Sequence, residues 1–167
     1  MKIQVLLIAG AVAVFASCSQ VSTQVPDRAA KAIQALNNND LATMKTLVSV
    51  DASDKTLIDA GSYNLASLTT VGSNQFIYSA TSWSVGTVSG SAVTATANGV
   101  SYVLKPTNAG STAGTTSTTP SGDLKIDFIN AGTLLADDWK VRRIYLPGNT
   151  TAVLKVPGFI QFTGDSH

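Results

Sequence analysis

Few side chains in this sequence could perform covalent or metal chemistry, and they do not form groups. Cys18 is the only cysteine and His167, the last residue, is the only histidine among 167 residues. A single thiol and a terminal histidine cannot supply the ligand spacing of a metal site or pair a nucleophile with its base. The sequence therefore predicts no catalytic residue of these classes, no metal and no cofactor.

Carboxylates are the remaining candidates for acid–base chemistry. Asp137-Asp138 could act as a pair, but Asp is a frequent turn residue and a predicted strand starts directly after them. Asp127 could serve as a general base if it pointed into a cavity. It alternates, however, with Leu124, Ile126 and Phe128, which predict an apolar inner face. We favour a turn for the pair and a solvent-facing position for Asp127, so an enzyme is the less favoured interpretation.

Four further side chains are candidate ligand-binding residues. Tyr78, Trp83 and Tyr102 could line a pocket, although buried aromatic rings more often simply pack in a core. Arg143 could bind an anion if the strand WKVRRIYL (139–146) alternated strictly and turned this side chain inward. Strict alternation buries a charged residue whichever face is inner, and an unpaired buried charge is costly.

A β-bulge at Arg142-Arg143 is the favoured solution for this strand. One extra residue reverses the alternation and leaves both cations exposed. The residues that would then face the core are Trp139, Val141, Ile144 and Leu146. In that case Arg143→Ala should change the free energy of unfolding by no more than about 0.5 kcal/mol.

The first eighteen residues, MKIQVLLIAGAVAVFASC, have the features of a secretory signal. Lys2 precedes an apolar run from Val5 to Phe15, and small residues follow. The run is shorter than the roughly 20 apolar residues that span a bilayer. The segment therefore predicts secretion without a membrane-spanning helix.

Phe15-Ala16-Ser17-Cys18 resembles the lipobox of bacterial lipoproteins, with Phe where Leu or Val is commoner. The resemblance implies removal of residues 1–17, a lipid on the Cys18 thiol and an anchor in a cell-envelope membrane. Because the next residue is Ser19 and not Asp, it also implies the outer membrane where the host has one. Each methylene of an acyl chain stabilises the anchored state by ~0.8 kcal/mol. The alternative is ordinary secretion after cleavage behind Ala16.

The charge balance limits the partners. The chain has eleven Lys and Arg against ten acids, all of them Asp. This balance argues against a nucleic-acid partner, which would need a basic surface. The roughly 150 residues that follow the signal match one domain and can bury a core without disulfides. We expect the membrane, through the lipid, and an unknown protein or small-molecule ligand as partners.

Helices are predicted in the first part of the mature chain. Residues 18–25 are polar and predict a tether. Pro26 then starts a helix, where its missing N–H costs nothing, and apolar residues at three- and four-residue spacing continue it. Asn37-Asn38-Asn39-Asp40 ends this helix, and residues 41–48 predict a second. Residues 53–60 predict a third helical piece.

Strands are predicted from Gln75 onward, where β-branched and aromatic residues become frequent. Two alternating runs, 92–97 and 100–105, flank Asn98-Gly99, and this pattern predicts a type I′ hairpin. Residues 107–122 are rich in Thr, Ser and Gly and predict an exposed, mobile loop that tolerates shortening.

Two more strands and an extension complete the prediction. Residues 123–130 and 139–146 are the predicted strands. The extension 148–167 could add one strand at a sheet edge, because Pro157 excludes a central place. The whole pattern predicts an α+β fold with N-terminal helices packed on a curved antiparallel sheet.

Two passages, AAKAIQALNNNDLATMKTLV and LKIDFINAGTLLADDWKVRRIYL, resemble the opening helices and closing hairpin of the nuclear-transport-factor-2-like, or ketosteroid-isomerase-like, superfamily. The resemblance implies a cone-like domain over 26–147 that encloses a cavity. Some members are enzymes, and in the isomerase branch an Asp is the general base. The favoured function is a membrane-anchored lipoprotein with a non-enzymatic binding or accessory domain. The alternatives are a small isomerase- or hydrolase-type enzyme and a structural envelope protein.

Overall fold

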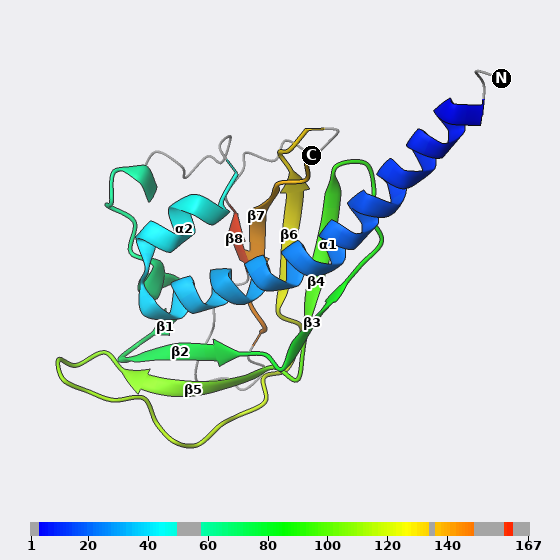
Figure 1. Ribbon diagram of the computed structural model, residues 1–167. Helices are drawn as coiled ribbons and strands as arrows, with labels where there is room; N and C mark the ends of the chain where they lie inside the picture. Colours follow the sequence, from blue (N-terminus) through cyan, green and yellow to red (C-terminus); the bar gives the residue numbers. More distant parts are fainter. Residues whose placement is uncertain (1–3, 50–57, 134–135, 149–158, 162–167) are drawn as a thin grey trace.

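The computed structural model describes residues 4–49, 58–133, 136–148 and 159–161, with side chains described from Gln20 to Gly148 within those ranges. Two N-terminal helices, α1 (Gln4–Asn38) and α2 (Leu41–Leu47), pack against two antiparallel sheets (Figure 1). The predicted α+β class is confirmed. The strands form two open sheets, whereas the sequence predicted one.

The smaller sheet has the order β1-β2-β5 and the larger one has the order β3-β4-β6-β7-β8. A 3-10 helix, η1 (Leu65–Thr69), leads into the smaller sheet. The strands are β1 (Thr70–Val71), β2 (Asn74–Ser79), β3 (Ser82–Val85), β4 (Ala92–Asn98), β5 (Ser101–Pro106), β6 (Lys125–Asn130), β7 (Trp139–Tyr145) and β8 (Phe159–Gln161).

α1 passes through Pro26 without a break, so the predicted helix start at Pro26 is wrong and residues 18–25 are helical. Val21 and Val25, only 9% and 0% exposed, lie four residues apart and therefore on one face of the helix. A proline inside a helix costs about 3 kcal/mol. Burying these valines, at about 1.5–3 kcal/mol each, offsets that cost.

The Asn-rich break between the helices is confirmed. Asn39 has a φ of 54°, in the left-handed region that Asn adopts more readily than most residues. Asp40 caps α2, because its carboxylate accepts hydrogen bonds from Thr43 N at 3.0 Å and Thr43 Oγ1 at 2.6 Å. These hydrogen bonds lower the pKa of the Asp40 carboxyl below its usual value.

The predicted hairpin at Asn98-Gly99 is wrong. β4 pairs with β3 and β6, while β5 pairs with β2. The pairs Ser79↔Ser101 and Ser82↔Asn98 continue one register, so β2–β3 and β4–β5 form one long hairpin that bends here. The reversal comes instead at residues 86–91, beside the bridge between Ser89 and Ala92.

Tertiary pairing explains why the chain bends instead of turning. A type I′ turn needs a positive φ at both central residues, and in this pair only Gly99 has one, at 58°. The Asn98 carbonyl accepts hydrogen bonds from Thr81 N at 2.9 Å and Thr81 Oγ1 at 3.0 Å. A Cβ at position 99 would collide with the Thr81 side chain, so glycine is needed for this close approach.

The predicted bulge in β7 is confirmed, but Arg142 and Arg143 are half-buried and not exposed as predicted. Asp127 pairs with Arg143 and the next residue of β6, Phe128, pairs with Val141, so Arg142 is the extra residue. The alternation reverses at this point. All four residues that the bulge predicted to face the core are at most 4% exposed, namely Trp139, Val141, Ile144 and Leu146.

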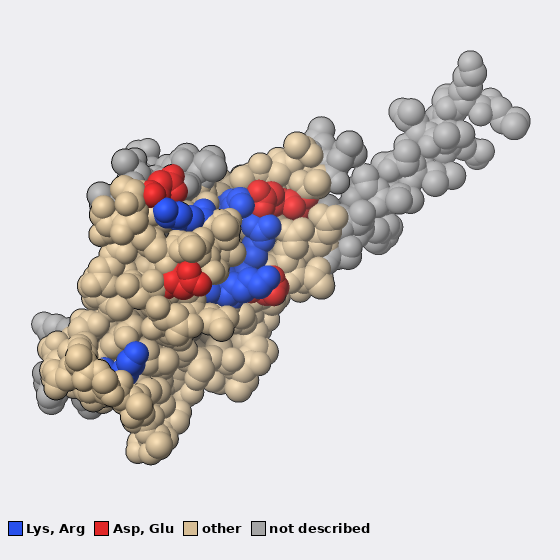
Figure 2. Space-filling model, turned by 60° about the vertical axis from the view of Figure 1, so that its left-hand side comes forward, with Lys and Arg blue, Asp and Glu red and all other residues tan. Residues whose placement is uncertain are grey.

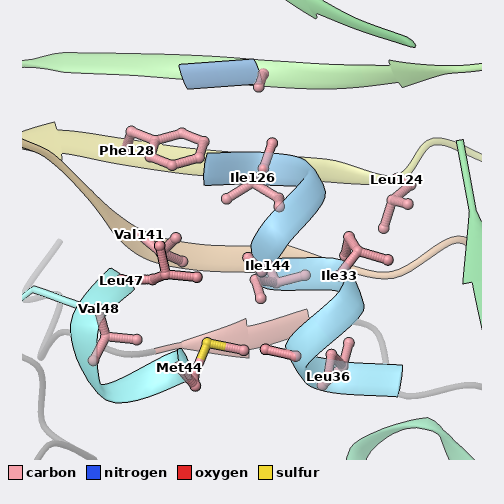
Figure 3. Close-up of a cluster of buried hydrophobic side chains, with 14 of the residues drawn as sticks. Ile33, Leu36, Met44, Leu47, Val48, Leu124, Ile126, Phe128, Val141 and Ile144 are labelled. Atoms are coloured by element: carbon pink, nitrogen blue, oxygen red, sulfur yellow. The ribbon is translucent and has the colours of Figure 1, made fainter. Parts of the chain in front are cut away.

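The core lies between the helices and the larger sheet. Figure 3 shows Ile33 and Leu36 of α1 facing Ile126 of β6 and Ile144 of β7. α2 extends this core through side chains that Figure 3 also labels, Met44, Leu47 and Val48. All seven are at most 5% exposed. The helices therefore cover the apolar face of the strands, and polar groups gather on the other face and at the ends.

Two predicted segments are described in part. Residues 53–57 of the third helical piece and most of the extension 148–167 lie outside the described residues. Ile58 is fully buried, and β8 pairs with β7 at the end of the sheet, as predicted for an edge strand.

The 107–122 loop is largely exposed, as predicted. Its Thr118 exchanges two backbone hydrogen bonds of 2.9 Å with Tyr102, so the loop covers the outer edge of β5.

Candidate functional site

Asp137-Asp138 lie where the β6–β7 connection approaches α1. The Asp138 carboxylate pairs with Arg28 at 2.8 Å and Lys140 at 3.3 Å. Asp137 Oδ1 accepts a hydrogen bond from Asn130 Nδ2 at 2.7 Å. The two carboxylates thus have separate partners. The predicted turn is wrong for these two residues: they lie in backbone without an assigned turn directly before β7, and Ala131 N donates to Asp138 O at 2.9 Å, so pairing between the two chain segments continues to this point. Figure 2 shows basic and acidic side chains lying beside one another on the face that it draws.

α1 binds the same connection through a row of polar residues that the sequence analysis did not single out. Gln20 Oε1 accepts from Asp137 N at 3.2 Å and Gln24 Nε2 donates to Asp137 O at 3.3 Å. Arg28 Nη1 donates to Trp139 O at 2.6 Å. The sequence could have predicted this row from its four-residue spacing beside Val21 and Val25, because such spacing places side chains on one face of a helix.

Asp127 lies on the outer face of the larger sheet, opposite the core, as predicted. Thr94 Oγ1 donates to Asp127 Oδ1 at 2.6 Å and Tyr145 OH donates to Oδ2 at 3.0 Å. Arg143 Nη1 donates to the Tyr145 hydroxyl at 3.2 Å. An open hollow of about 590 Å³ lies here, lined by Thr94, Thr96, Asp123, Lys125, Asp127 and Tyr145. Both Asp127 oxygens are engaged, which favours a structural use of this carboxylate.

Two of the predicted aromatic ligand residues come together in the structure. The rings of Tyr78 and Tyr102 lie 6.1 Å apart between centroids, and Phe76 lies 4.9 Å from Tyr102. Tyr78 is 2% exposed, and burial, with a smaller contribution from Tyr102, raises the pKa of its phenol. Trp83 packs against the core from β3, and Arg143 lies on the opposite face of the larger sheet. The four candidate residues therefore do not form one site.

Asn37 is a structural residue that the sequence analysis missed. Its Nδ2 donates to Tyr78 O at 2.7 Å and its Oδ1 accepts from Tyr78 N at 3.0 Å. β1 is too short to pair with this part of β2, so the amide replaces a strand at that edge. In the sequence, Asn37 is distinguished only by its place in an Asn-rich helix end, and this position predicts a helix cap equally well.

A polar hollow of about 740 Å³ lies at the far end of α1, between η1 and the end of β5. Lys105 is the charged residue in its lining. On the wall of the hollow, Asn39 Oδ1 accepts a hydrogen bond from Ala66 N at 3.2 Å. The lining side chains are mostly amides and hydroxyls, which suit a small polar ligand; they include Asn64, Ser67, Thr70, Gln75, Asn108 and Ser111.

In the part of the chain that the structure describes, no three His, Cys, Asp or Glu side chains are grouped closely enough to hold a metal ion. The same residues include no helix with the length and apolar character needed to cross a membrane. No family model, curated protein or solved structure matches the chain.

Proposed function

We propose that this protein is a lipoprotein of the bacterial cell envelope, held at a membrane by a lipid on Cys18. The observation that carries the proposal is the place of the only cysteine, directly after an apolar run and two small residues. A diacylated, thioether-linked lipid and an acylated amino terminus would together supply three acyl chains, more than the two signals that stable anchoring needs. In a host with two membranes, the residue Ser19 favours the outer one.

We further propose that the folded domain is cone-like, similar to the nuclear-transport-factor-2-like superfamily. The order of elements supports this: helices come first, and an antiparallel meander follows. The two long strands of that meander bend together, at residues 80–81 and 99–100, which carries the chain from one sheet into the other.

The domain is proposed to act in binding or as an accessory domain, without catalysis. Each carboxylate considered for acid–base chemistry has at least one structural partner: hydroxyl groups for Asp127, Asn130 for the Oδ1 atom of Asp137, and cations for Asp138. The polar hollow around Lys105 supports binding of a small polar ligand. A structural envelope protein is the second candidate, favoured by the burial of aromatic rings such as Tyr78 and Trp139 in the interior.

Fractionation of cells that express wild type, Cys18→Ala or Ser19→Ala tests the lipid anchor. We expect wild type and the Ser19→Ala control to sediment with membranes and to incorporate labelled fatty acid. Cys18→Ala should incorporate none, and should be released or keep its signal. Equal labelling of Cys18→Ala and wild type, or an unlabelled wild type, would contradict the proposal.

A further inference from the structure

The proposed anchor lies very close in sequence to the folded domain. Gln20 is two residues after Cys18, and it already accepts a hydrogen bond from the backbone of Asp137 at 3.2 Å. Val21 directly after it is 9% exposed. Two residues span at most about 7 Å even when fully extended. A lipid on Cys18 would therefore hold the Gln20 end of the domain at the bilayer surface, a step that rests on the proposed function.

Two chain connections lie at this end of the domain. One is the β6–β7 connection, residues 131–138, which Gln20 and Gln24 bind. The other is the β3–β4 connection, residues 86–91. Asn130, the last residue of β6, donates from its N to Ser91 O at 2.7 Å. In Figure 1 both connections lie at the end of the larger sheet from which the blue N-terminal part of α1 projects.

The described surface of these connections suits a lipid interface. Residues 86–91, and residues 131–133 and 136, are exposed and carry no charge. Val88, 43% exposed, is the large apolar side chain that stands out on the described surface. Two charges lie within the β6–β7 connection. Asp138 pairs with Arg28 and Lys140, and the Oδ1 of Asp137 accepts a hydrogen bond from Asn130 Nδ2 at 2.7 Å. Both carboxylates are half-buried, whereas the uncharged residues beside them are exposed.

We propose that the β3–β4 connection and residues 131–133 and 136 rest on the membrane, with Val88 at the boundary between headgroups and acyl chains. α1 runs on from Gln20 to Asn38, about 27 Å at 1.5 Å per residue. The polar hollow beside Asn39 lies at that far end. The anchored protein thus presents the hollow to the aqueous phase, where a soluble polar ligand can reach it.

Spin labels can measure this orientation in the lipidated protein. Lipidation consumes the Cys18 thiol, so Val88→Cys and Asn108→Cys each provide one reactive thiol, the second beside the polar hollow. Both labelled variants are placed in vesicles of phosphatidylethanolamine and phosphatidylglycerol. We expect the label at residue 88 to collide several-fold less with a water-soluble nickel chelate, and more with oxygen, than the label at residue 108.

Two controls separate this inference from the lipid anchor itself. Labelled fatty acid in the same samples reports acylation, and an unacylated protein would overturn both proposals. A flexible Gly-Ser insertion between Ser19 and Gln20 should make residue 88 nearly as accessible to the chelate as residue 108. An acylated protein with equal access at both positions, and no effect of the insertion, would overturn the orientation alone.

Discussion

The two faces of the β6–β7 pair are built from the same two strands and serve different purposes. On the inner face Ile126, Phe128, Val141 and Ile144 are fully buried. On the outer face Asp127, Arg143 and Tyr145 form a chain of hydrogen bonds that is partly open to solvent. A regular strand could not carry this sequence on both faces. The bulge permits it, because one extra residue lets the two adjacent arginines face outward while the apolar residues on both sides of them face the core.

The comparison also shows where chemistry could take place. The inner face holds aliphatic and aromatic side chains packed against α1 and α2, whereas the outer face and the far end of α1 hold carboxylates, amides and Lys105. If stability depends on the inner face and ligand binding on the polar surfaces, substitutions on the two should have effects of very different size.

Inserting one alanine between Arg143 and Ile144 should have the largest effect, because the bulge already takes up one extra residue of β7. A second extra residue would turn Ile144 and Leu146 out of the core. Losing two large aliphatic side chains from the core should cost about 4–10 kcal/mol, enough to unfold an ordinary domain. Urea unfolding followed by circular dichroism measures this loss. The control Arg142→Ala keeps the residue count and should cost about 1 kcal/mol or less. An insertion variant as stable as wild type would show that the alternation after the bulge is not needed.

Phe128→Ala should have the next largest effect. The ring is 0% exposed and belongs to the hydrophobic core, so its loss leaves a cavity there. The expected loss of unfolding free energy is about 3–5 kcal/mol. Lys125→Ala, on the outer face of the same strand, is the matched control and should cost about 0.5 kcal/mol. Equal losses for the two variants would remove the distinction between the faces.

Asn37→Ala tests a polar contact that the core depends on. Its amide satisfies both backbone groups of Tyr78, and leaving these groups without a partner should cost about 1–3 kcal/mol. The exposed neighbour Asn38 is the control, and Asn38→Ala should change the melting temperature very little. Matching melting temperatures for the two variants would mean that water replaces the amide at the edge of β2.

Arg143→Ala should have the smallest effect, no more than about 0.5 kcal/mol, since the guanidinium lies on the outer face. Denaturant unfolding of this variant measures the loss of stability on the outer face, for comparison with the loss on the inner face. A loss above about 2 kcal/mol would instead identify Arg143 as part of a buried charge network.

Local patterns in the sequence predicted the parts of the fold that local forces decide. The Asn-rich break after α1 and the strand around Asp127 followed from residue types and spacing over a few residues. The bulge at Arg142-Arg143 followed from the same reasoning, because adjacent cations and flanking apolar residues are incompatible with strict alternation.

Long-range contacts decided the features that the sequence did not reveal. Asn98-Gly99 has the residues of a tight turn, yet pairing with β3 and β6 on both sides of β4 holds the strand in a bend. Pro26 lies inside a helix because buried apolar residues continue on its N-terminal side. The partners of Asp127 include Thr94, 33 residues away, and no local pattern predicts such a contact.

The central claim is that Cys18 carries the lipid that places the domain at a membrane. Intact-protein mass spectrometry of the protein extracted from membranes tests this most directly. We predict a mature chain that begins at Cys18 and carries the added mass of acyl chains. A mature chain with a free thiol at Cys18 and no added mass, or one that begins directly after Ala16, would contradict the claim.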